Sequence, residues 1–187
     1  MKKLFPDWRF AGLLTGLFVT ALILVTSVHA APHRHGISEL LVALDGDILT
    51  MEISAPGKDL AGFESAPKTP DQKKRYTRVL AVLKSADKMF SLSKKAACEP
   101  EDIDILEQLA GHEDHEHAKE HKDEHDETHG EFRVRYVFRC DSPGKLDRII
   151  INAFEHFPDM QSMKLKFIGP WGTVVRELSP SDPATGL

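Results

Sequence analysis

Apolar and polar residues alternate along several stretches of the chain, which is the pattern of β-strands that bury one face. The stretches from Ile37 to Leu44 and from Asp47 to Ser54 are joined by Asp45-Gly46, a pair favoured in tight hairpin turns. We therefore expect a β-hairpin, followed by a loop from Ala55 to Lys68 that contains proline and glycine.

The clearest alternation lies later in the chain. Residues 131–140 interleave one glutamate and three arginines with the apolar positions Phe132, Val134, Tyr136, Phe138 and Cys140. Met163, Leu165 and Phe167 then alternate with lysines, and a turn at 169–172 leads into a last stretch near Thr173 to Leu178. This half of the chain predicts three further strands.

Two segments instead repeat apolar residues at helical spacing. The first opens with Thr69-Pro70-Asp71-Gln72, which provides an N-cap, a proline at the first helical position and a glutamine at the capping-box position. The second opens at Ser142-Pro143 and is stopped by Pro158. Their apolar positions are Tyr76, Val79, Leu80 and Leu83 in the first helix, and Leu146, Ile149, Ile150, Ala153 and Phe154 in the second.

The resulting order is ββα, a loop, and then βαββ. It predicts a single α+β domain in which two helices pack on a mostly antiparallel sheet. We assign this domain to residues 31–187, with a flexible, disordered loop at 111–130.

Residues 1–30 have the composition of a cleavable export signal. Lys2, Lys3 and Arg9 precede an uncharged apolar run from Ala11 to Val28, and Val28-His29-Ala30 fits a signal-peptidase site. Cleavage after Ala30 would leave an exported mature chain with no membrane insertion. Because the apolar run is long, a retained membrane anchor is the alternative.

Residues 112–129 contain six histidines and eight carboxylates, with no apolar residue larger than alanine. Neutral imidazole is a favoured ligand for zinc, copper and nickel, whereas a solvated acidic linker needs charge but no histidine. The carboxylates repel one another and nothing apolar offsets the entropy of ordering, so we expect a disordered loop that orders on binding metal. The candidate ligands are His112, His115, His117, His121, His125 and His129, of which the last four are spaced by four residues.

A second candidate metal site lies at the predicted mature N-terminus, where His33 and His35 flank an arginine. An amino-terminal copper or nickel site would need a deprotonated amide at the second residue, and Pro32 has none. The two imidazoles can still bind metal, with Glu39 or Glu64 as a partner; a solvated tail is the alternative. We expect His156 to be a surface histidine or a helix-capping histidine.

The chain has two cysteines, Cys98 and Cys140, one on each side of the His-rich loop. In an oxidising compartment we expect them to form a disulfide that tethers the two roots of the loop. Closing a loop of this length contributes about 4 kcal/mol in the chain-entropy model. The alternative, in which both thiolates bind zinc with histidines between them, matches no compact structural zinc spacing.

The formal charge of −5 becomes −7 when the signal segment is removed, and residues 112–129 account for −6 of it. The remaining body is nearly neutral, and with no basic patch expected in it we do not predict a nucleic-acid partner. The sequence has no Ser/His/Asp arrangement, glycine-rich phosphate loop or His-Glu-x-x-His motif, so we do not expect an enzyme.

Five short motifs recur together in one known family. They are His33-x-His35-Gly36 after the signal, Leu44-Asp45-Gly46, Gly62-Phe63-Glu64 with Pro67, the His-rich loop between two cysteines, and Phe154-Glu155-x-Phe157-Pro158. Over essentially the whole mature chain, these resemble the ZrgA-like periplasmic zinc-binding proteins of Gram-negative bacteria. One departure is Ser65, which stands where relatives often have a histidine, so no ligand role is carried over to that position.

The resemblance implies a periplasmic protein that captures or buffers zinc and assists its delivery to an ABC-type zinc importer. It also implies that His33, His35 and the loop histidines are zinc ligands. Copper or nickel sequestration is the alternative within metal binding, because imidazole does not select zinc over copper. From another class, the chain could be an envelope interaction domain whose acidic loop docks a basic partner.

Overall fold

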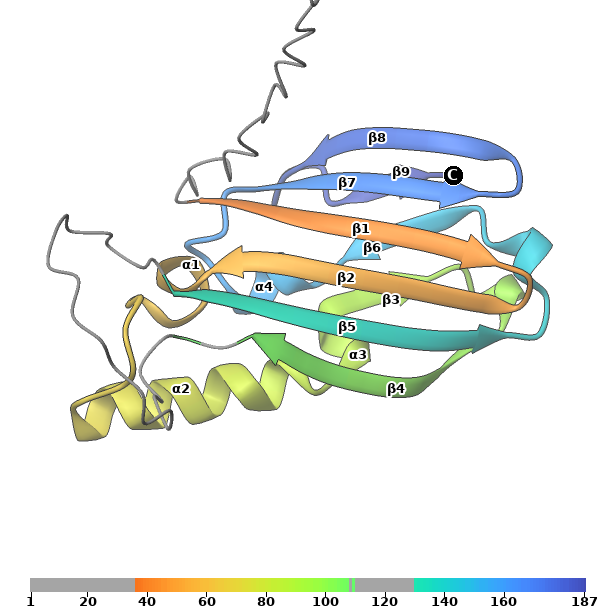
Figure 1. Ribbon diagram of the computed structural model, residues 1–187. Coiled ribbons are helices and arrows are strands. Elements are labelled where there is room, and N and C mark those ends of the chain that lie inside the picture. Colours follow the sequence, from red (N-terminus) through yellow and green to blue (C-terminus); the bar gives the residue numbers. More distant parts are fainter. Residues whose placement is uncertain (1–35, 108, 110–129) are drawn as a thin grey trace, which may run out of the picture. The chain divides into compact units, whose positions relative to one another are not determined.

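The computed structural model describes residues 36–107, 109 and 130–187, which form two β-sheets and the short helices between them (Figure 1). The larger sheet has the strand order β4-β5-β2-β1-β7-β8, and of its pairs only β1–β7 is parallel among the described strands. The predicted fold class, a single α+β domain with a mostly antiparallel sheet, is confirmed. The six strands are β1 (Ile37–Asp45), β2 (Ile48–Pro56), β4 (Cys98–Glu107), β5 (Glu131–Cys140), β7 (Ser162–Gly169) and β8 (Gly172–Leu178).

A second layer covers one face of this sheet. It contains a three-stranded sheet of order β3-β6-β9 together with the helices (Figure 1). The strands are β3 (Phe90–Leu92), β6 (Arg148–Ile151) and β9 (Ala184–Gly186). The helices are α1 (Gly57–Ala61), α2 (Pro70–Leu83), α3 (Ala86–Met89) and α4 (Ala153–His156), with 3₁₀ turns η1 (Lys94–Ala96) and η2 (Pro143–Lys145).

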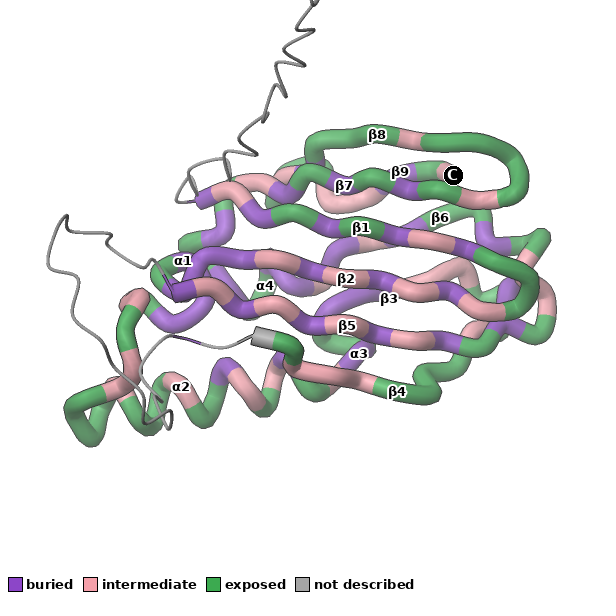
Figure 2. The backbone as a smooth tube through the Cα atoms, in the orientation of Figure 1, coloured by how far each residue is buried: buried purple, intermediate pink, exposed green. Residues whose placement is uncertain are grey.

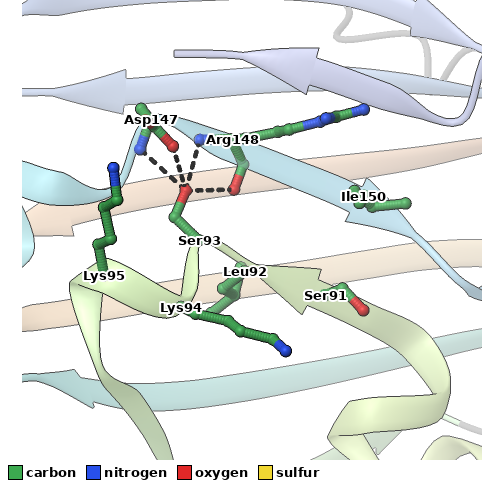
Figure 3. A pocket seen from close by; sticks show the side chains of 8 residues that line it. All are labelled: Ser91, Leu92, Ser93, Lys94, Lys95, Asp147, Arg148 and Ile150. Atoms are coloured by element: carbon green, nitrogen blue, oxygen red, sulfur yellow. Dashed lines mark hydrogen bonds between the residues drawn. The ribbon is translucent and has the colours of Figure 1, made fainter.

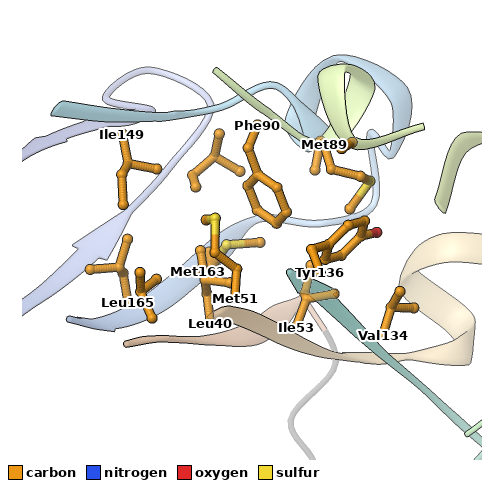
Figure 4. Close-up of a cluster of buried hydrophobic side chains, with 14 of the residues drawn as sticks. Leu40, Met51, Ile53, Met89, Phe90, Val134, Tyr136, Ile149, Met163 and Leu165 are labelled. Carbon is orange, nitrogen blue, oxygen red and sulfur yellow. The ribbon is translucent and has the colours of Figure 1, made fainter. Parts of the chain in front are cut away.

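The hydrophobic core lies between the two layers. Each central strand buries every second residue, so purple alternates with pink or green along β1, β2 and β5 in Figure 2. In Figure 4, Leu40, Met51 and Ile53 of the large sheet face Met89, Phe90 and Ile149 of the second layer. Burial of such side chains contributes roughly 1.5–3 kcal/mol each, so the strand alternation read from the sequence is also what holds the layers together.

Helix α2 starts as the sequence predicts. The Thr69 hydroxyl accepts a hydrogen bond from the Gln72 backbone, and the Gln72 side chain accepts one from the Thr69 backbone, which together form the capping box. Val79 and Leu83 are buried. The hydroxyl of Tyr136 donates to the Leu83 carbonyl at 2.8 Å, which ties the end of α2 to the middle of β5.

The prediction of one helix from Ser142 to Pro158 is wrong. The segment contains the turn η2, the strand β6 and the short helix α4 instead. Ile149 and Ile151 are buried while Ile150 between them is half-buried, so the period is two rather than 3.6. Three consecutive β-branched isoleucines favour an extended backbone. Strand β3 pairs with one side of β6 and strand β9 with the other, so the backbone of β6 has hydrogen-bonding partners on both sides.

The strands β3, β4 and β9 were not predicted, and the expected loop from Ala55 to Lys68 contains the end of β2 and helix α1. Strand β4 is rich in carboxylates and contains Pro100, both unusual in strands. It lies at the sheet edge, where Arg135 binds Asp104 at 2.6 Å and Arg139 binds Glu101. Pairing with the arginines of β5 therefore compensates for its poor strand propensity.

Among the residues that the structure describes, no helix is long and apolar enough to cross a membrane.

Candidate metal centre

The predicted metal ligands lie outside the described residues. This holds for His33 and His35 before β1, and for all six histidines of the loop, namely His112, His115, His117, His121, His125 and His129. The structure does describe the residues that follow and precede these segments in the chain. Gly36 comes directly after His35, and Gly130 comes directly after His129.

Gly36 is attached to the domain through the buried carboxylate of Asp59. The Gly36 N–H donates to Asp59 Oδ2 at 2.7 Å, and its carbonyl accepts from the N–H groups of Gln161 and Ser162 at 2.9 and 2.8 Å. Gly36 has φ +80°, and a Cβ there would lie 2.9 Å from the Gln161 side chain, so glycine suits this position. Asp59 is 4% exposed, which makes this charge-assisted bond strong.

Gly130 is attached to the same short helix through Gly57. The Gly57 N–H donates to the Gly130 carbonyl at 2.7 Å. A Cβ on Gly57 would lie 2.0 Å from Leu109 Cδ2, and a Cβ on Gly130 would lie 1.9 Å from the Glu64 carbonyl oxygen. Leu109 is 6% exposed. Leu109 before the His-rich segment and Gly130 after it therefore pack closely against the segment from Gly57 to Glu64, where a side chain on Gly57 or Gly130 would not fit.

The two anchors lie at the same end of the large sheet. In the strand register, Glu39 of β1 pairs with Ser54 of β2, and Ser54 pairs with Arg133 of β5. Gly36 lies three residues before Glu39, and Gly130 lies three residues before Arg133. Because only β2 lies between β1 and β5, the backbones of the two glycines are two strand spacings apart, or about 10 Å. Helix α1 lies at this end in Figure 1 and contacts both. The fold thus brings together the exit points of two histidine segments that are far apart in the sequence.

The other candidate ligands are dispersed around this end of the domain. Glu64 is half-buried beside Gly130, whereas Glu39 is exposed on the open face of the sheet. His156 is exposed, as predicted, and with Asp59 lines a cavity of about 320 Å³ between α1, α2 and α4. Within the described residues, no three histidine, cysteine, aspartate or glutamate side chains lie close enough to hold a metal ion.

The predicted disulfide between Cys98 and Cys140 is confirmed, and it excludes the alternative in which both thiolates bind zinc. Its expected role is wrong, however. The two cysteines face each other at the start of β4 and the end of β5, whereas the loop joins the opposite ends of these strands. The bond therefore secures the edge strand far from the loop roots, which are held by Leu109, Gly57 and Gly130 instead.

The sequence does not indicate the roles of Asp59 and Gly57, because both lie in the stretch for which it predicts a loop. Helix α1 has only five residues, which is too short for a periodic apolar pattern. Their partners are distant in the sequence, at Gly36 and Gly130. The one available signal was an aspartate two residues after Pro56-Gly57, where it lies in the first turn of the helix.

A comparison with protein families matches residues 32–187 to the family described as ZrgA family zinc uptake protein. The match covers the whole described domain, the His-rich loop and the segment with His33 and His35. No curated protein matches the chain.

Proposed function

The chain belongs to the ZrgA family of zinc uptake proteins, and on that premise we propose that it is a periplasmic zinc-binding protein. It captures or buffers zinc through His33, His35 and the histidines of residues 112–129, and it assists delivery of the ion to an ABC-type zinc importer. Residues 1–30 direct export and are removed after Ala30. Zinc is the cargo of this protein rather than a resident structural ion.

The observation that carries this proposal is the attachment of both histidine segments to helix α1. Asp59 holds the residue that follows His35, and Gly57 holds the residue that follows His129. With exit points about 10 Å apart, ligands from both segments can reach one ion, since zinc binds imidazole nitrogen at roughly 2.0–2.1 Å. Several histidines within one polar segment suit capture and release better than a closed four-ligand structural site does.

Calorimetric titration of the metal-free mature chain with zinc tests this proposal. Two variants are compared with it, one lacking residues 111–129 and one with His33→Ala and His35→Ala. We expect each variant to bind zinc more weakly than the intact chain, and we expect the wild-type protein to release zinc as the pH falls through the imidazole range near about 6.5. Wild-type protein that binds no zinc would refute the proposal.

The same titration with copper addresses the alternative function. A histidine-only site binds copper(II) at least as strongly as zinc in the usual affinity order, so affinity by itself does not assign the cargo. Growth of a deletion strain decides between them. Sensitivity to zinc starvation supports zinc uptake, whereas sensitivity to excess copper or nickel would favour sequestration.

A further inference from the structure

The charge of the domain is unevenly distributed, which corrects the expectation of a body without a basic patch. Residues 68–97 contain nine lysines and arginines against two aspartates, a net charge of +7. Since the whole chain carries −5, the rest of the chain carries −12. Six of these cations lie on or next to α2 and α3, and we call them the basic face: Lys73, Lys74, Arg75, Arg78, Lys84 and Lys88.

The basic face is exposed, and cations outnumber acids in its segment, since the acids of residues 68–97 are Asp71 and Asp87. All six residues are exposed, and exposed positions recur along the outer side of α2 in Figure 2. In the described part of the chain none of the six forms an ion pair. The arginines of β5 differ in this respect, since Arg133, Arg135 and Arg139 all pair with carboxylates of the neighbouring strands β2 and β4 or the β1–β2 turn.

One residue of the basic face, Arg75, contacts the segment of helix α1 and Gly62. Arg75 Nη1 donates to the carbonyl of Ala61 in α1 at 3.4 Å, and the Cβ of a side chain at Gly62 would lie 2.6 Å from the same nitrogen. The cationic surface continues past α3, where Lys94, Lys95 and Arg148 line a cavity of about 250 Å³ (Figure 3). The one acid of that cavity, Asp147, accepts a hydrogen bond from Ser93.

A surface of this charge repels the free zinc ion, so it is not itself a metal site. A protein that receives zinc must present ligands around its own site, and where these are carboxylates its surface has the opposite charge. Complementary potentials orient such partners and raise their association rate by roughly 10- to 1,000-fold. We propose that the basic face is the docking surface for a carboxylate-rich protein that accepts zinc, an inference that rests on the proposed function.

Binding to a carboxylate-rich acceptor tests this inference directly. The probe is a fluorescent peptide of alternating glutamate and histidine, titrated with zinc-free mature protein. The face variant carries Lys73→Glu, Lys74→Glu and Arg78→Glu. The control variant carries Lys164→Glu, Lys166→Glu and Arg176→Glu, which reverses the same residue types at exposed positions on β7 and β8. Both variants have the same net charge, and thermal unfolding checks that both are folded.

We expect the face variant to bind the peptide at least about tenfold more weakly than the control variant at low salt. This difference should disappear between about 0.01 M and 1 M salt, as the screening length falls from roughly 30 Å to roughly 3 Å. Zinc transfer from zinc-loaded protein to the peptide should also be slower for the face variant than for the control variant. Because peptide binding is measured without zinc, a failure of zinc capture does not affect this readout.

Equal weakening in both variants would mean that only total charge matters and would overturn the inference, as would no weakening in either. Binding to vesicles of phosphatidylglycerol and phosphatidylethanolamine provides the remaining outcome. If the face variant loses vesicle binding and keeps peptide binding, the basic face contacts a lipid surface and the assignment to a protein acceptor is wrong.

Discussion

Replacing Gly130 with alanine tests whether the roots of the His-rich loop are packed as closely as the structure indicates. The added methyl group would lie 1.9 Å from the carbonyl oxygen of Glu64 and 2.8 Å from Leu109 Cδ2. Gly130 does not have a positive φ, so alanine introduces no backbone strain of its own. Most of the cost comes from contact with the Glu64 backbone, which cannot rotate away as the Leu109 side chain could.

The magnitude follows from two contributions. Overpacking of a closely packed site costs about 1–3 kcal/mol. A shift of Gly130 away from Glu64 also weakens the 2.7 Å hydrogen bond from Gly57, with a net value of about 1 kcal/mol. We therefore expect Gly130→Ala to lower the free energy of unfolding by about 2–4 kcal/mol, which corresponds to a fall in Tm of about 4–16 °C for a domain of this size.

Thermal and urea unfolding of the mature chain measure this effect, with Gly144→Ala as the matched control. A Cβ at Gly144 meets nothing within 4 Å, so that substitution should change stability by no more than about 0.5 kcal/mol. Gly57→Ala provides a second comparison, because its closest clash, 2.0 Å, is with the movable Leu109 side chain. Adding Leu109→Ala should offset a larger part of the Gly57→Ala cost than of the Gly130→Ala cost, because the closest contact at Gly130 is with a backbone oxygen. Equal stability of the Gly130 and Gly144 variants would refute the close approach of Gly130 to Glu64.

Three further predictions follow from the described contacts. Asp59→Asn should destabilise the domain by about 1–3 kcal/mol and weaken zinc binding on calorimetry, because it loses the charged acceptor of the Gly36 N–H; unchanged zinc affinity would contradict its positioning role. Replacing both Cys98 and Cys140 with serine should cost about 4 kcal/mol in urea unfolding and leave zinc binding intact, since the bond is remote from the loop roots. Burial raises the pKa of Tyr136 in the folded state, so the folded state is favoured fully below the unfolded pKa of about 10 and less as the pH rises above that value. When unfolding free energy is measured above about pH 10, it should therefore fall less steeply with pH for Tyr136→Phe than for the wild-type protein.

Much of the domain could be predicted from local patterns. The alternation of apolar and polar residues predicts the hairpin of β1 and β2 and the strand β5. Helix α2 begins at the capping box formed by Thr69 and Gln72, which is recognisable in the sequence. Segment 142–158 was misread because Leu146, Ile149 and Ala153 fit a helical spacing as well as a strand followed by a turn. Pairing with β3 and β9 decides between them, and those partners lie about 60 and 35 residues away in the chain.

The candidate metal centre also has features that the sequence indicates and features that only the structure shows. Composition and spacing alone identified the histidine segments and the cysteine pair. The elements that hold those segments, Asp59 and Gly57 of α1, came only from the structure.

The sequence by itself predicted the hairpin of β1 and β2, the strand β5, the start of α2 and a disulfide between the two cysteines, and it supplied the histidines that we propose as zinc ligands. These properties depend on neighbouring residues or on side-chain type. Only the tertiary structure decided that Gly36 and Gly130 lie at the same end of the sheet, that the disulfide joins the opposite ends of β4 and β5, and that the six cations of the basic face line α2 and α3. Strand order and register set those positions, and they depend on pairing between distant parts of the chain.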